Sequence, residues 1–196
     1  MHNQVITLAR EFGSGGRLIG KRLSELLQIP FYDREVIVEA ARKTGLSEDY
    51  ISEAEQKKSR FIYNLSFSPE NLPLSDQVFL AQAEVIRAAA QKGSCVIVGR
   101  CADDILREHP GRISVFIHAP LDQRIRRARE VYHVEAADVK SDVLRRDKQR
   151  AAYYNYFTNA RWGQLKNYDM TLDSSVGIEQ AAQLICQLVK FRGDRN

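Results

Sequence analysis

A glycine-rich turn lies near the N-terminus, between an apolar run and a helical pattern. Val5 to Ala9 is apolar and partly β-branched, which is typical of a buried strand. The turn Gly13-Ser14-Gly15-Gly16-Arg17 follows, and apolar residues then recur at helical spacing over 18–27. The backbone N–H groups of such a turn can converge on an anion, and the dipole of the following helix adds favourable partial charge. The sequence therefore predicts a strand–turn–helix unit that binds phosphate.

The rest of the chain alternates apolar runs with helical patterns. The apolar runs that predict further strands are 31–32, 95–98, 113–117 and 170–172. Strands that alternate with helices form a parallel sheet covered on both faces. We therefore expect an α/β, doubly wound fold, and the length of 196 residues fits one domain over 1–196.

Capping residues mark the expected starts of several helices. Asp33 can cap the helix after the second strand, Ser47 a short helix, and Ser75 a long helix that ends at Gly93. The segment 57–75 mixes prolines and polar residues with aromatic ones. We interpret it as a mobile covering segment whose aromatic side chains need a surface to pack on.

Composition narrows the possible functions. The net charge is +4, from 29 Lys and Arg against 25 Asp and Glu, which is modest for a nucleic-acid-binding protein and suits a small polyanion equally well. The three cysteines show no metal-ligand spacing, which favours structural thiols in a reducing compartment. The apolar run at 5–8 is too short for a signal peptide or a membrane span. We therefore expect a cytoplasmic protein with no membrane partner. Nucleic-acid binding through the basic residues of 120–160 is a weaker alternative, because those residues alternate with acidic ones.

Two nucleotide-binding motifs fit the glycine turn poorly. The dinucleotide pattern G-x-G-x-x-G fails because Leu18 replaces its third glycine. The Walker pattern G-x-x-x-x-G-K-[ST] fits from Gly15 to Lys21 except for its last position, Arg22. That alignment is disfavoured because Lys21 follows residues already in the helical pattern, a turn too late to reach phosphates.

Counting from the end of the strand gives a better alignment. Gly15 then takes the second Walker glycine and Gly16 the lysine position, and no serine or threonine directly follows to supply the metal-side hydroxyl. Arg17 is the nearest cation and can fork onto phosphate oxygens, although a guanidinium does not simply replace an ammonium group. Mg²⁺ could still be held mainly by nucleotide phosphates, waters and a carboxylate. The alternative is a turn that merely tightens the connection.

Several motifs in the same order resemble the cytidylate kinase-like family. The matching stretches are Ile6 to Arg17, Pro30 to Arg34, Cys95 to Arg100, Arg145 to Tyr154, and Asn167 to Ser174. The resemblance implies a P-loop NTPase three-layer fold with a central parallel sheet of about five strands and a helical lid at about 120–160. It also implies ATP and Mg²⁺ as cofactors and nucleotides as substrates.

The resemblance assigns roles to individual residues. Gly13, Ser14, Gly15, Gly16 and Arg17 would hold the donor phosphates, and Asp33, Arg100, Asp147 and Arg150 the acceptor. Arg17 and the lid arginines Arg124 and Arg127 would neutralise charge during transfer, and no residue is assigned as a metal ligand. The pattern departs from the family at Gly16, where a lysine is expected, and at Glu39 and near 77–79, where arginines are expected.

These residues also have simpler interpretations. Asp147 and Arg150 are spaced as a helix-surface ion pair, and a charge run such as 124–129 is often a solvated face. The aromatic patch at 153–162 favours a packed helix face or a subunit contact, as in a homodimer, over base stacking. The leading hypothesis is ATP-dependent phosphoryl transfer to a small acceptor, by resemblance a nucleoside monophosphate such as CMP. The alternative is a noncatalytic nucleotide-binding or regulatory module.

Overall fold

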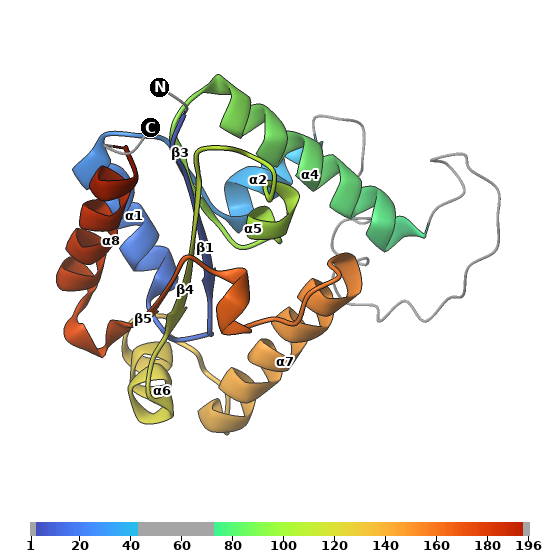
Figure 1. Cartoon of the computed structure of the whole chain (residues 1–196). Coiled ribbons are helices and arrows are strands. Elements are labelled where there is room, and N and C mark those ends of the chain that lie inside the picture. The colour runs from blue at the N-terminus through green and yellow to red at the C-terminus, as the bar shows by residue number, and fades with distance from the viewer. Residues whose placement is uncertain (1–2, 43–72, 194–196) are drawn as a thin grey trace.

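Five parallel strands form the centre of the computed structural model, which describes residues 3–42 and 73–193 (Figure 1). Their spatial order is β2-β3-β1-β4-β5. The strands are β1 (Val5–Arg10), β2 (Phe31–Tyr32), β3 (Cys95–Val98), β4 (Arg112–His118) and β5 (Met170–Asp173). β1 pairs with β3 on one side and β4 on the other, with Ile6 opposite Val96 and Ile113. The predicted parallel sheet of about five strands is confirmed.

Helices cover both faces of this sheet (Figure 1). On one face, α1 (Gly16–Leu27) and α8 (Ile178–Gly193) pack on Ile6, Leu8 and Val115. On the other face, α2 (Arg34–Arg42), α4 (Leu74–Lys92) and α5 (Ala102–Ile105) surround Val5 and Ile97. The alternation of β1 side chains between the two clusters follows from the two-residue period of a strand. Each core cluster therefore belongs to one face of the sheet.

The predicted lid region contains two helices beyond the end of β4 (Figure 1). α6 (Leu121–Glu130) follows β4 directly, and α7 (Val139–Phe157) begins at the N-cap Asp138, which accepts a hydrogen bond from the backbone of Ser141. Two short 3₁₀ helices, η2 (Leu165–Asn167) and η3 (Ser174–Val176), flank β5.

The aromatic patch packs within the chain. Phe157 of α7 stacks on Phe79 of α4 with ring centroids 4.2 Å apart, and Trp162 packs edge-on against Phe116 of β4 at 5.3 Å. These contacts support the packed helix face over base stacking. They join the lid region to the body of the domain.

One expected cap is absent, and some expectations fall elsewhere. α4 begins at Leu74 after Pro73, and the hydroxyl of Ser75 donates to Asp76 instead of capping the helix. The fixed φ of proline and its missing N–H suit a position beside a helix start, so a serine cap is unnecessary. The expected helix after Ser47 and most of the covering segment 57–75 lie outside the described residues. Over 3–42 and 73–193, no helix is both long and apolar enough to cross a membrane.

Candidate active site

The glycine turn forms the open N-terminus of α1, as the sequence predicts. Gly13 and Gly15 have φ angles of +80° and +81°, in the left-handed region that favours glycine. A Cβ at Gly13 would lie 2.5 Å from the carbonyl oxygen of Arg124, and one at Gly15 would lie 2.6 Å from Ile178. Gly15 is the N-cap, and no side chain caps the helix. The first-turn N–H groups therefore remain available to an anion.

Ser14 contributes backbone to this turn while its side chain faces the protein. Its hydroxyl donates to the carbonyl oxygen of Glu11 at 2.9 Å, and its carbonyl accepts from the buried hydroxyl of Ser174 at 2.5 Å. Ser174 therefore anchors the turn from the connection after β5. The sequence contains no local signal for this contact, because 160 residues separate the partners.

Arg17 and Asp33, predicted for donor and acceptor sites respectively, meet in an ion pair. Arg17 donates through Nε and lies 2.8 Å through Nη2 from the same Asp33 oxygen, while its side chain stays half exposed. The other oxygen of Asp33 accepts from the backbone of Glu35 at 3.0 Å and Val36 at 3.2 Å, so Asp33 caps α2 as predicted. The guanidinium of Arg17 is therefore directed toward β2 and α2.

Arg124 and Asp147, predicted for lid and acceptor roles, form a buried cluster beneath the turn. Arg124 pairs with Asp147 and donates to the carbonyl oxygen of Phe12 at 3.3 Å. Asp147 also accepts from the backbone N–H of Phe12 at 2.6 Å, and Glu11 lies 3.4 Å from Nε of Arg124. These contacts fix both backbone polar groups of Phe12. The cluster therefore holds the turn from α6 and α7.

Arg127 lies over the glycine turn itself. It donates to the carbonyl oxygen of Gly13 at 2.7 Å, and its Cζ is 3.4 Å from the position that a Cβ on Gly15 would take. Arg127, in the region predicted as a lid, is therefore a cation beside the glycine turn, in contrast to the buried Arg124.

A pocket rich in arginine lies beside the turn. It has a volume of about 330 Å³, and five of its eight lining residues are arginines. We call it the arginine pocket; it is lined by Arg10, Phe12, Arg34, Arg100, Arg146, Gln149, Arg150 and Tyr153. No carboxylate is among the described residues that line it. Such a pocket is suited to an anionic guest.

Two predicted acceptor residues, Arg100 and Arg150, line this pocket from different elements. Arg100 follows β3 within three consecutive residues of positive φ, Gly99 at +79°, Arg100 at +58° and Cys101 at +55°. Such backbone is costly for non-glycine residues and often accompanies function. Arg150 of α7 donates to the carbonyl oxygen of Arg10 at 3.1 Å and lies over the ring of Phe12.

The positive charges of the arginines in the pocket repel one another. The pKa of Arg150 is lowered to about 10, chiefly by burial; Asp147 opposes the lowering, and the charges of Arg146 and Arg100 add to it. Burial also lowers the pKa of Arg10, and the charges of Arg150 and Arg100 add to that effect. A bound anion would remove this repulsion.

The sequence reasoning missed Arg10, Arg34 and Arg146. Arg10 carries a usable signal, because it directly follows a buried strand, as Gly99-Arg100 follows another, and parallel strands end at the same edge. Arg34 and Arg146 directly adjoin the predicted site residues Asp33 and Asp147. Only the packing of α7 and α2 shows that these side chains line the pocket.

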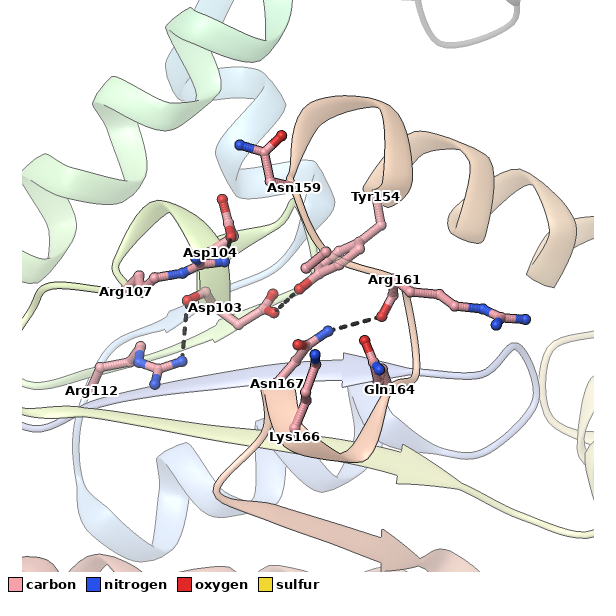
Figure 2. A pocket seen from close by; sticks show the side chains of 11 residues that line it. Asp103, Asp104, Arg107, Arg112, Tyr154, Asn159, Arg161, Gln164, Lys166 and Asn167 are labelled. Atoms are coloured by element: carbon pink, nitrogen blue, oxygen red, sulfur yellow. Dashed lines mark hydrogen bonds and ion pairs between the residues drawn. The ribbon is translucent and has the colours of Figure 1, made fainter.

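A second and larger cavity, of about 610 Å³, lies between α5, the end of α7 and η2 (Figure 2). Figure 2 shows the hydroxyl of Tyr154 directed at Asp103, to which it donates at 2.7 Å, and Arg112 donating to the Asp103 carbonyl at 3.2 Å. Burial raises the pKa of Asp103, and the hydrogen bond from Tyr154 opposes this. The lining mixes acidic and basic groups and includes no glycine-turn residue. We therefore assign the candidate site to the arginine pocket.

The described residues fit Mg²⁺ only as an ion bound mainly through a nucleotide. Over 3–42 and 73–193, no three His, Cys, Asp or Glu side chains gather as a metal site. The carboxylates nearest the turn are engaged, Asp33 with Arg17 and Glu11 with the backbone of Ala119. Few protein ligands are needed where phosphates and waters fill the coordination sphere.

Comparison with known families identifies the chain. The model of the cytidylate kinase-like family matches residues 5–176. The chain belongs to this family. A comparison with curated protein sequences found no significant match. Family membership and fold together support a kinase that acts on a nucleotide or another small molecule.

Solved structures similar to this family member confirm the P-loop kinase fold. An uncharacterized protein from Eubacterium ventriosum is 28% identical, with a TM-score of 0.75 and coverage of 95% of this chain and 98% of that chain. Shikimate kinase from Acinetobacter baumannii is 17% identical, with a TM-score of 0.54 and coverage of 96% and 93%. APS kinase from Mycobacterium tuberculosis is 15% identical, with a TM-score of 0.56 and coverage of 96% and 98%.

Proposed function

We propose that this protein transfers the γ-phosphoryl group of ATP to a small anionic acceptor. The observation that carries the proposal is the arginine pocket beside an uncapped, glycine-rich helix N-terminus. The helix N-terminus suits the phosphates of a donor, and the arginine pocket suits a charged acceptor. Arg10 and Phe12 belong to the strand-turn connection and also line the pocket, so the two features are contiguous. Transfer between two such anions requires charge neutralisation and alignment more than covalent help from the protein.

The donor side would use the turn from Gly13 to Arg17. Its backbone N–H groups bind the phosphates, and Arg127, which already contacts Gly13, adds a cation. Arg17 joins the donor turn to Asp33 at the acceptor side. Mg²⁺ bound to the ATP phosphates would supply further neutralisation of charge.

The acceptor side would use Arg100 and Arg150 as phosphate ligands. Their guanidinium groups lie against Tyr153 and Phe12 respectively, with Arg100 5.6 Å and Arg150 5.3 Å from the ring centroids, which limits their orientations. Asp147 acts through Phe12 and Arg124, as a positioning residue. Asp33 directly precedes Arg34 of the arginine pocket, so a polar group of the acceptor could reach it.

A nucleoside monophosphate such as CMP is the acceptor that the family name suggests. The two kinases of similar fold were solved with shikimate and with APS, both of them anions. The five arginines of the pocket favour an acceptor with a phosphate over one with a single carboxylate, because a phosphate dianion satisfies more donors.

A coupled ADP-release assay tests the proposal directly. The purified full-length protein with Mg²⁺ and ATP is supplied with CMP, UMP, AMP, GMP, dCMP, shikimate or APS in turn, and ATP binding is measured by calorimetry. We expect acceptor-dependent ADP release with at least one phosphorylated acceptor. ATP binding without transfer to any of them would favour the noncatalytic nucleotide-binding module instead.

A pair of variants tests the alignment of the glycine turn. Arg17→Ala is expected to weaken ATP binding more than Lys21→Ala does, because Lys21 is exposed one turn into α1. Calorimetry measures both. Equal or reversed losses would show that the other Walker alignment is the correct one.

A further inference from the structure

The side chain of Arg10 lies against Gly16, the position that the lysine occupies in the Walker pattern. A Cβ built on Gly16 would stand 2.7 Å from Cβ and 2.9 Å from Cγ of Arg10. A Cβ built on Gly99 would stand 1.8 Å from its Nη1. The stem of Arg10 therefore runs over Gly16, and its guanidinium rests against the backbone at Gly99.

The identity of Gly16 is explained by this contact and not by backbone geometry. Gly16 is the first residue of α1, and its φ is outside the left-handed region occupied by Gly13 and Gly15. Glycine inside a helix costs roughly 0.5–1 kcal/mol relative to alanine. An alanine or a lysine at position 16 would collide with the stem of Arg10. Arg10 and the glycine at the lysine position are therefore two parts of one arrangement.

The guanidinium of Arg10 has no carboxylate in ion-pair contact within residues 3–42 and 73–193. No ion pair or hydrogen bond of its guanidinium occurs among the described residues, although the side chain is partly buried. Burial lowers the pKa of Arg10 most, the like charges of Arg150 and Arg100 lower it further, and Asp33 opposes them more weakly. A partly buried cation facing two others is expected to be matched by an anion from outside the protein.

We propose that Arg10 supplies the cation that lysine provides in the usual Walker turn, and that it contacts the phosphoryl group between donor and acceptor. The proposal rests on the kinase function above and assigns the missing charge to the residue at the first Walker glycine position. In the alignment counted from the strand end, Arg10, Gly15 and Gly16 occupy the three positions G, G and K. The cation has moved from the last of these positions to the first.

The place of Arg10 matches the chemistry of transfer. An oxygen of the acceptor phosphate bonds to the γ-phosphorus, and the bond to the β–γ bridging oxygen breaks with its electron pair left on ADP. No proton moves when the attacking oxygen belongs to a phosphate dianion. Arg10 lines the arginine pocket, and its stem also contacts the turn at Gly16. Its guanidinium can therefore contact the transferred phosphoryl group where the donor and acceptor sites meet.

A charge relocation within the turn tests this proposal. Arg10→Gly removes the cation, Gly16→Lys adds a lysine against the stem of Arg10, and the double variant recreates G-x-x-x-x-G-K. Binding of ATP and of tripolyphosphate is measured by calorimetry, with thermal unfolding as the check on folding. We expect each single variant to weaken binding about tenfold to a hundredfold, as loss of a charge-assisted contact predicts, and the double variant to recover most of it. A double variant no better than the product of the two single losses would overturn the proposal.

A second set keeps the stem and changes only the charge. Arg10→Gln should lose tripolyphosphate binding, Arg10→Lys should keep part of it, and Lys21→Ala should match the wild type as an exposed single-charge control. If Arg10→Gln binds tripolyphosphate as the wild type does, Arg10 does not hold phosphate. This readout is independent of turnover, so the proposal about Arg10 survives if no acceptor is found, and it fails alone if a working kinase is indifferent to Arg10→Gln.

Discussion

Arg124 and Asp147 form a buried ion pair that joins α6 to α7 beneath the glycine turn. Both side chains also hold the backbone of Phe12, Arg124 through its carbonyl oxygen and Asp147 through its N–H. Two residues that the sequence suggests for ligand binding thus spend their polar groups on each other and on the turn. We therefore expect these two residues to contribute to a kinase by positioning the turn.

Breaking this pair is expected to destabilise the fold. Asp147→Ala leaves the buried Arg124 guanidinium with only the Glu11 carboxylate, 3.4 Å from Nε, so the cost in the free energy of unfolding should approach that of a broken buried pair, about 3–5 kcal/mol. Arg124→Met with Asp147→Ala removes both charges and is expected to cost less than the sum of the single changes. Urea unfolding measures this cycle. Lys148→Ala, exposed on the same helix, is the control, and strict additivity would contradict the coupling.

Arg127 is expected to affect the donor phosphates selectively. Arg127→Ala should weaken ATP binding about tenfold or more, because it removes a cation over Gly13 and Gly15. Arg126→Ala changes an exposed arginine at the preceding position of α6 and should leave the Kd unchanged. Calorimetry compares the two. A similar loss in both variants would indicate a general effect of net charge.

The buried pair of Asp103 and Tyr154 is expected to make stability depend on pH. Burial raises the pKa of Asp103 above its ordinary 3.8, so the folded state binds this proton more tightly than the unfolded chain does. The free energy of unfolding therefore falls as pH rises from about 4 through the higher folded pKa. Asp103→Asn removes this loss, so it should become more favourable relative to wild type at pH 8 than at pH 4. Urea unfolding at both values measures the difference, which a structural role without titration would leave constant.

The hydroxyl of Tyr154 is expected to stabilise the carboxylate form of Asp103. Tyr154→Phe leaves a buried carboxylate without its donor at 2.7 Å, which should cost about 1–3 kcal/mol at pH 8. At a pH where Asp103 is protonated, the cost should shrink. Tyr156→Phe, whose side chain is largely exposed, is the matched control and should change stability by less than about 0.5 kcal/mol.

The cysteines are expected to behave as structural thiols. Burial raises the pKa of Cys95 to about 11, and burial together with Asp103 raises that of Cys101 further. Because the thiolate is the reactive form, both should label slowly with dithiobisnitrobenzoate at pH 8 in the native protein and rapidly in denaturant. Cys186, only partly buried, should account for any fast native phase. Persistence of that phase in Cys186→Ser would disprove the assignment.

The sequence alone determined the strand, the turn and the helix at the N-terminus, the parallel direction of the strands, and the resemblance to the family. These features are local or periodic. Strand 5–10 is apolar and ends in glycines, Asp33 can cap only the helix that follows it, and motifs in a shared order identify relatives without any coordinates.

The tertiary structure alone decided which cations lie at the glycine turn and in the arginine pocket. Arg17 is closest to the turn in sequence, yet it pairs with Asp33, whereas Arg10 lies over Gly16 and lines the arginine pocket. The direction of a long side chain depends on the elements packed around it, here β3 through Gly99 and α7 through Arg150. Those contacts join residues about 90 and 140 positions apart, which no local pattern encodes. For the same reason, the sequence shows only that the lysine is missing at position 16. The fold supplies the physical cause, which is the contact between Gly16 and Arg10.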